Sequence, residues 1–272
     1  MKADRLATLA ENPDFIPGIY NYCDRWCQRC AFTGRCLSFA SERDEFPDGE
    51  TPDLDSEEFW ESFTETMNSS LELLRQMAAE DGIDLDAIDY DQIDAERQAM
   101  QTAVDEHPLT KAAERYAGMV NDWFENNAAA FEQKGEELEM FVRLNIGSAD
   151  VTGQAARISD AVEVIQWYQL FIAEKIVSAL YSRSYAFADE SDGRPSDADG
   201  SAKICLIAIE RSLAAWAVLL RAFPHLQTEN LELLAQLERL GKGLELEFPN
   251  ARAFQRPGFD VPPPGEPALE LE

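Results

Sequence analysis

The stretch TGQAARISDAVEVIQWYQLFIAEKIVSALYSRSY, residues 152–185, is apolar on nearly every face when it is read as a helix. The stretch SAKICLIAIERSLAAWAVLLRAF, residues 201–223, has the same character and follows a polar loop at 189–200. Helices of this kind lie at the centre of a bundle, surrounded by amphipathic partners. The sequence therefore predicts an all-α fold, a multi-helix bundle with two largely buried central helices that form a core hairpin.

Amphipathic patterns predict the helices around this hairpin, at about 55–79, 92–105, 109–133, 136–146 and 228–244. The first pattern begins at Asp55 or Ser56, either of which can cap a helix. Its apolar residues recur at helical spacing, at Phe59, Trp60, Phe63, Met67, Leu71 and Leu74. Since the sequence has no alternating strand pattern of useful length, we assign 55–247 to one helical bundle.

The remaining segments differ in composition from the bundle. Residues 1–40 hold four cysteines among aromatic residues, and residues 41–54 are acidic and contain Pro47 and Pro52. The chain becomes proline-rich over 248–272. These features predict a Cys-rich metal-binding segment (1–40), an acidic linker (41–54) and a C-terminal tail (248–272) that is extended and either flexible or draped on the body.

Charge and composition limit the partners of the chain. Its 272 residues include 52 Asp and Glu against 23 Lys and Arg, for a net charge of −29. Nucleic-acid binders need a basic surface, so direct binding to nucleic acid or to an anionic membrane is not expected. The most apolar run, 204–220, carries Glu210 and Arg211 at its middle, which is typical of a core helix and not of a membrane span. With no apolar segment of signal-peptide length near Met1, we expect a cytoplasmic protein.

The cysteines form the strongest chemical signal. Cys23, Cys27, Cys30 and Cys36 follow the pattern C-x3-C-x2-C-x5-C, whereas Cys205 stands alone in an apolar run and is expected to be a small buried hydrophobe. In an intracellular chain such a group indicates a metal centre before it indicates disulfides. The four cysteines are therefore the predicted metal and cofactor ligands.

Two metal centres suit four thiolates from one short segment. Structural zinc sites usually combine two C-x2-C knuckles that are well separated in sequence, and here only Cys27 and Cys30 form such a knuckle. A [4Fe–4S] cluster is larger and is held by irregular short spacings in ferredoxin-type runs. The spacing favours a [4Fe–4S] cluster, with a zinc ion as the alternative.

Two short resemblances bear on this choice. The run CQRCAFTGRC, residues 27–36, resembles the cluster loop of the helix-hairpin-helix DNA glycosylases, whose pattern is C-x6-C-x2-C-x5-C. The resemblance implies a [4Fe–4S] cluster; it does not extend to the glycine-rich hairpin or basic surface of those enzymes. The first three cysteines also fit the C-x3-C-x2-C of radical S-adenosylmethionine enzymes, but the strands of their barrel are missing and the fourth cysteine would close the open iron.

Residues among the cysteines fit a metal centre. Arg25, Arg29 and Arg35 are expected to lower the pKa of the thiols and to offset the charge of a thiolate cluster, unless they are ordinary solvated side chains. Nearby aromatic residues would either shield a cluster from water or anchor the segment on the bundle; they are Tyr20, Tyr22, Trp26, Phe32 and Phe39.

Histidine chemistry is limited in this chain. A ferritin-like di-iron centre needs Glu-x-x-His pairs, but Val104 and Ala222 stand three residues before His107 and His225, which are the two histidines. Both histidines lie beside a proline at a predicted helix boundary, which favours a capping role.

A few polar residues on the central helices form a second candidate site. Glu163 and Glu174 share one helical face, and Lys203 and Glu210 share a face of the partner helix. They predict either a ligand pocket, completed by Lys175 and Arg211, or structural ion pairs, because buried charges are costly unless paired.

These observations leave three hypotheses for function. The first is a cytoplasmic protein whose [4Fe–4S] cluster serves electron transfer, redox sensing or structural support, with a redox or protein partner. The second is a zinc-stapled helical interaction module. The third is an enzyme with a small-ligand pocket between the two central helices, for which neither catalytic residues nor a substrate can be named.

Overall fold

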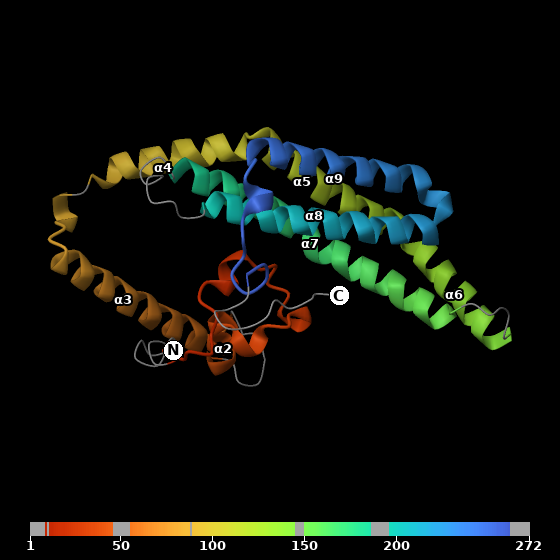
Figure 1. The fold of residues 1–272 in the computed structure, drawn as a ribbon, viewed down its shortest axis with the longest axis horizontal. Coiled ribbons are helices and arrows are strands. Elements are labelled where there is room, and N and C mark those ends of the chain that lie inside the picture. Colours follow the sequence, from red (N-terminus) through yellow and green to blue (C-terminus); the bar gives the residue numbers. More distant parts are fainter. Residues whose placement is uncertain are drawn as a thin grey trace. The chain divides into compact units, whose positions relative to one another are not determined.

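The computed structural model describes residues 9, 11–45, 55–87, 89–144, 150–185 and 196–261. These residues form α-helices and short 3₁₀ turns, with no strand apart from an isolated bridge between Pro257 and Val261. The all-α prediction is therefore confirmed. The chain divides into two compact units, one of residues 1–97 with 255–272 and one of residues 98–254 (Figure 1).

The second unit is a helical bundle built on a central pair. Its helices are α5 (Pro108–Asn126), α6 (Ala128–Leu144), α7 (Val151–Tyr185), α8 (Asp197–Ala222) and α9 (Gln227–Glu247). α7 and α8 make the most extensive contact, α5 packs on α7, and α9 packs on both α5 and α8 (Figure 1). The predicted core hairpin is present, at nearly the predicted bounds.

Small and large residues alternate in the bundle core. Ala179 on α7 and Ala202 and Ala208 on α8 are fully buried, which lets these two helices approach closely. Larger side chains fill the space towards α5, where the rings of Trp123 and Trp216 meet edge to face with centroids 5.0 Å apart. The core is thus made by the residues whose apolar pattern predicted it.

Helix boundaries differ from the predicted ones in two regions. The patterns predicted helices over 109–133 and 136–146, but the chain breaks at Asn127 and α6 continues through the predicted break at 134–135. The side-chain amide of Asn127 donates to the carbonyl of Trp123 at 2.8 Å. Asparagine favours such breaks because its side chain competes with the backbone. α8 begins at Asp197, four residues before the predicted start, and its first turn carries Asp197 and Asp199, which suit the positive end of a helix dipole.

The first unit contains the cysteines and the long helix α3. It comprises 3₁₀ turns at Ile19–Tyr22, Cys27–Arg29, Thr33–Arg35 and Leu85–Ala87, with α2 (Leu37–Glu45) and α3 (Glu57–Glu80). Helix α4 (Tyr90–Asp105) runs across the division between the units. The Ser56 hydroxyl caps α3 by accepting from the backbone N–H of Phe59 at 3.2 Å, as predicted.

The division of the chain differs from the sequence-based one in two places. α3 was assigned to a bundle over 55–247, whereas it lies in the first unit. α2 enters the stretch assigned to an acidic linker, and residues 46–54 lie outside the described part. No helix in the described ranges is long and apolar enough to cross a membrane.

Candidate metal centre

A small apolar core holds the cysteine-bearing turns together. Ile16, Ile19 and Phe32 are buried, and Cys30 and Cys36 pack against them. The backbone N–H of Ile16 donates to the carbonyl of Arg35 at 3.0 Å, which joins the two ends of this compact segment. The three 3₁₀ turns between these ends therefore wrap around a core of their own.

The start of the proline-rich tail closes over this core. The Phe259 ring lies edge to face on Phe32, with centroids 4.9 Å apart. Gly258 adopts a φ of 77°, and a Cβ there would lie 2.8 Å from Cδ1 of Ile19. The Arg256 guanidinium is buried and binds the Asp260 carboxylate through two contacts of 3.0 Å. Residues 255–261 of the tail are thus draped on the Cys-rich segment. Residues 248–254 belong to the second unit, where the turn Ala251–Ala253 packs on α8, and residues 262–272 lie outside the description.

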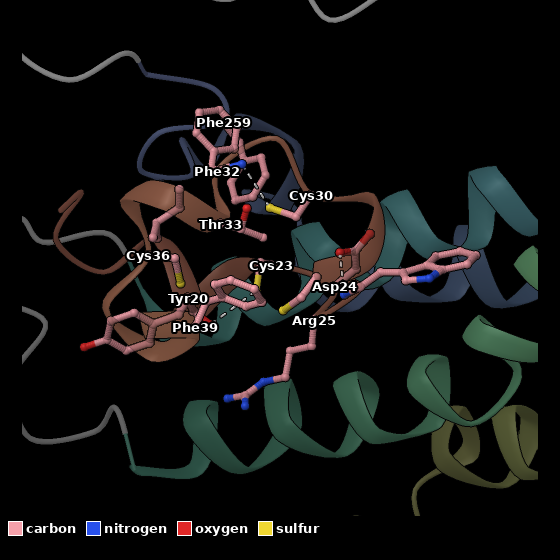
Figure 2. Close-up of a pocket in the computed structure, with 13 residues that line it drawn as sticks. Tyr20, Cys23, Asp24, Arg25, Cys30, Phe32, Thr33, Cys36, Phe39 and Phe259 are labelled. Carbon is pink, nitrogen blue, oxygen red and sulfur yellow. Dashed lines mark hydrogen bonds between the residues drawn. The ribbon is translucent and has the colours of Figure 1, made fainter. Parts of the chain in front are cut away.

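All four clustered cysteines line one hollow (Figure 2). Each stands at the edge of a 3₁₀ turn: Cys23 ends the first, Cys27 begins the second, and Cys30 and Cys36 follow the second and third. The hollow measures about 320 Å³, including space open to solvent. Its remaining lining is mostly apolar or aromatic and includes Ile19, Tyr20, Trp26, Phe32, Phe39 and Phe259.

The thiols influence one another's ionisation. Burial is the largest effect and raises the pKa of Cys23, Cys27 and Cys30. The charges of the neighbouring thiols add to this effect, and Cys27 is affected by all three others. The four sulfur atoms therefore lie near enough to share one electrostatic environment.

Backbone donors reach two of the sulfur atoms. The N–H of Phe32 donates to Sγ of Cys30 at 3.4 Å, and the N–H of Arg25 donates to the sulfur of Cys23 and lowers its pKa. Such N–H···S bonds favour a thiolate and tune iron–sulfur clusters. Arg25 holds its amide in place with a φ of 54°, a left-handed conformation that is costly for a residue other than glycine.

The arginines among the cysteines differ in what they contact. Arg25 lowers the pKa of Cys23, as predicted, but burial outweighs its effect. The Arg29 guanidinium instead lies 4.0 Å from the centroid of the Trp26 ring, and Nε of Arg35 donates to the carbonyl of Asp14 at 3.2 Å. Burial governs these thiols because they face an apolar hollow, which sequence spacing does not reveal.

The described residues do not display a formed metal site. No group of three or more His, Cys, Asp or Glu side chains among them is placed to hold a metal ion. All five cysteines are free thiols, and Cys205 is fully buried on α8, as expected for a small hydrophobe. The donor set and the hollow fit a thiolate-bound centre, and Cys23, Cys27, Cys30 and Cys36 remain its candidate ligands.

The second candidate site is not assembled. Glu163 and Glu174 are exposed on α7. Nζ of Lys203 donates to the carbonyl of Arg252 at 2.8 Å, and the Arg252 guanidinium binds Glu210 at 2.7 Å. The residues predicted to line a pocket therefore lie at the surface or in structural pairs. Of the two alternatives that the sequence allowed, this arrangement matches the structural one.

The histidines differ in role. Nδ1 of His107 accepts from the backbone N–H of Leu109 at 3.2 Å and caps α5, as predicted. His225 is exposed within the 3₁₀ turn Pro224–Leu226, which has no side-chain cap.

Sequence reasoning missed Phe259, which reaches the hollow from the far end of the chain. The only local signal was the PG pair just before it, which is typical of a turn. Comparisons with models of protein families, with curated proteins and with solved structures find no match.

Proposed function

We propose that Cys23, Cys27, Cys30 and Cys36 hold one [4Fe–4S] cluster and that the protein exchanges single electrons with a protein partner. The observation that carries the proposal is the convergence of all four thiols on one hollow. A cluster of this kind supplies one-electron redox chemistry at a potential set by its surroundings. Because four protein thiolates would occupy all four irons, electron transfer suits the donor set better than substrate binding at iron.

The spacing of the cysteines supports a cluster over a single ion. The spacing is short and irregular, as in ferredoxin-type runs, and Cys27 and Cys30 form the only C-x2-C knuckle. Backbone N–H donors at Cys23 and Cys30 supply the hydrogen bonds that stabilise cluster sulfur.

The position of the thiols suits electron exchange. All four cysteines are partly buried, so that a cluster here would lie just below the surface, within reach of a docked partner. The aromatic lining would keep bulk water from most of its faces. A cytoplasmic location is part of this proposal.

A zinc staple is the second candidate. It is favoured by the small core of Ile16, Ile19 and Phe32, because a segment with so few buried residues gains from a metal crosslink. In this case the cysteines serve the fold alone, and the function lies in a surface that binds another protein.

Metal content and the visible spectrum of protein purified without oxygen separate the two. We expect nearly four irons and four inorganic sulfides per chain, with broad visible absorbance that bleaches on reduction. Single Cys→Ser variants at positions 23, 27, 30 and 36 should each lose iron. The matched control is Cys205→Ser, which alters the buried cysteine outside the hollow and should retain it. A colourless protein with one zinc would establish the staple, and a chain without either metal would overturn both proposals.

A further inference from the structure

Helix α3 carries an exposed apolar stripe that the metal centre does not involve. The stripe consists of Trp60, Phe63, Met67, Leu71 and Leu74, whose exposed fractions lie between 44% and 60%. Their periodicity predicted burial within the bundle. A face of this size left in solvent marks an interaction site on a protein surface.

The stripe has the spacing of one face of an amphipathic helix. Successive members are three, four, four and three residues apart, which places all five within an arc of about 80° at 100° per residue. Glu61, Glu65 and Glu72 lie roughly 120° to 160° from the middle of that arc, on the outer side of the helix. The margins next to the stripe hold mostly uncharged residues, with Glu57 and Arg75 as the charged ones.

We propose that this stripe is a homodimer interface, in which α3 of one chain packs along α3 of a second copy. An apolar stripe on one helix face can pack against its own copy across a two-fold axis, as an isologous contact requires. Each chain carries a net charge of −29, so two copies can meet only where acidic residues are few. The stripe meets this condition because most glutamates of α3 lie on the other side of the helix, and only Glu57 lies near its margin.

The available area suits a pair of helices. A large side chain presents on the order of 200 Å² when fully exposed, so five that are about half exposed offer about 500 Å² per copy. Two copies together bury about 1,000 Å² from the stripe alone, which is the lower bound for a specific interface. Met77, which is 51% exposed at the margin, adds to this area.

A lipid surface fits this helix less well than a second chain does. Helices that lie on membranes carry Lys and Arg on the polar face, which attract anionic headgroups. The polar face of α3 carries glutamates instead, with Arg75 as its one basic residue. Anionic lipid would therefore repel the helix.

Light scattering after size exclusion tests the proposal on the full chain. We expect wild type at twice the chain mass of 30.5 kDa. Leu71→Glu puts a carboxylate into the stripe and should shift the mass to that of one chain. Met67→Gln should also shift the mass to that of one chain. Glutamine is unbranched and has good helix propensity, so circular dichroism can show that α3 is still folded in this variant.

The matched control is Gln76→Glu, which adds the same charge at an exposed position on the opposite side of α3 and should remain dimeric. Wild type at the mass of one chain at the highest concentration of a dilution series would overturn the proposal. So would dimers that persist in both Leu71→Glu and Met67→Gln. This test does not depend on the metal, because it reads mass and not iron.

Discussion

Gly258→Ala tests whether the tail holds the Cys-rich segment in its folded form. Gly258 has a φ of 77°, and its backbone lies against the buried side chains of Ile16 and Ile19. A Cβ would meet Cδ1 of Ile19 at 2.8 Å and Cδ1 of Ile16 at 3.1 Å. The substitution therefore adds backbone strain and overpacking at the same point.

The two effects can be given magnitudes. A left-handed conformation costs alanine about 1 to 2 kcal/mol relative to glycine. An extra methyl group in a packed core costs about 1 to 3 kcal/mol, here towards the lower end because the ends of two isoleucine side chains can shift. Restriction of the unfolded chain by alanine returns about 0.5 kcal/mol. The net loss of local stability is then about 1.5 to 3.5 kcal/mol.

Hydrogen exchange is the suitable assay because it reports opening of a segment without global unfolding. The amide of Ile16, which donates to Arg35, and the amide of Gly258, which donates to Val261, are the probes. The expected loss corresponds to exchange that is about 10 to 400 times faster, where exchange follows the opening equilibrium. Wild type and variant are compared at equal metal content.

The matched control is Gly34→Ala in the same segment. A Cβ at Gly34 meets nothing within 4 Å, and its φ is not left-handed, so protection of the Ile16 amide should be unchanged or slightly higher. Equal exchange of Ile16 in Gly258→Ala and in wild type would refute the reasoning, since it would mean that the tail does not close over this core.

Three further predictions concern the bundle, α3 and the metal. Tyr116→Phe removes the acceptor of the 3.0 Å bond from the Trp216 indole N–H in the buried core, and should lower the free energy of unfolding in denaturant by about 1 to 3 kcal/mol; an unchanged midpoint would contradict it. Ser56→Ala removes the cap of α3 and should cost about 1 kcal/mol, seen as faster amide exchange in the first turn, whereas Ser56→Asp should keep protection near the wild-type level. Removal of the proposed metal by a chelator or by oxidation should speed exchange over residues 16–36 and leave α7 and α8 protected, because its candidate ligands lie in the first unit; equal loss of protection in both units would contradict this prediction.

The periodicity of apolar residues predicted a helix correctly where the residues of that helix are sufficient to form it. The central hairpin was predictable because both α7 and α8 are long and rich in apolar residues. Only α8 is largely buried, since α7 keeps an exposed face along Asp160, Glu163, Leu170 and Glu174. The break at Asn127 was not, because apolar spacing continues through it and only the side-chain bond to the Trp123 carbonyl reveals the turn.

The apolar stripe of α3 shows the limit of the same reasoning. Its pattern predicts that one face is to be covered, but it carries no information about which surface covers it. α3 was assigned to the bundle because the pattern does not tell which surface covers its apolar face. In the structure α3 lies in the unit of the cysteines, and its stripe is exposed.

By itself the sequence determined the helical class, the central hairpin and the four candidate ligands, because helix periodicity and cysteine spacing are local properties of the chain. Tertiary structure alone decided what surrounds the ligands. Phe259 closes the hollow from more than two hundred residues away, and burial there, rather than the nearby arginines, sets the pKa of the thiols. Both depend on contacts between distant residues, and such contacts leave no regular spacing that a sequence could display.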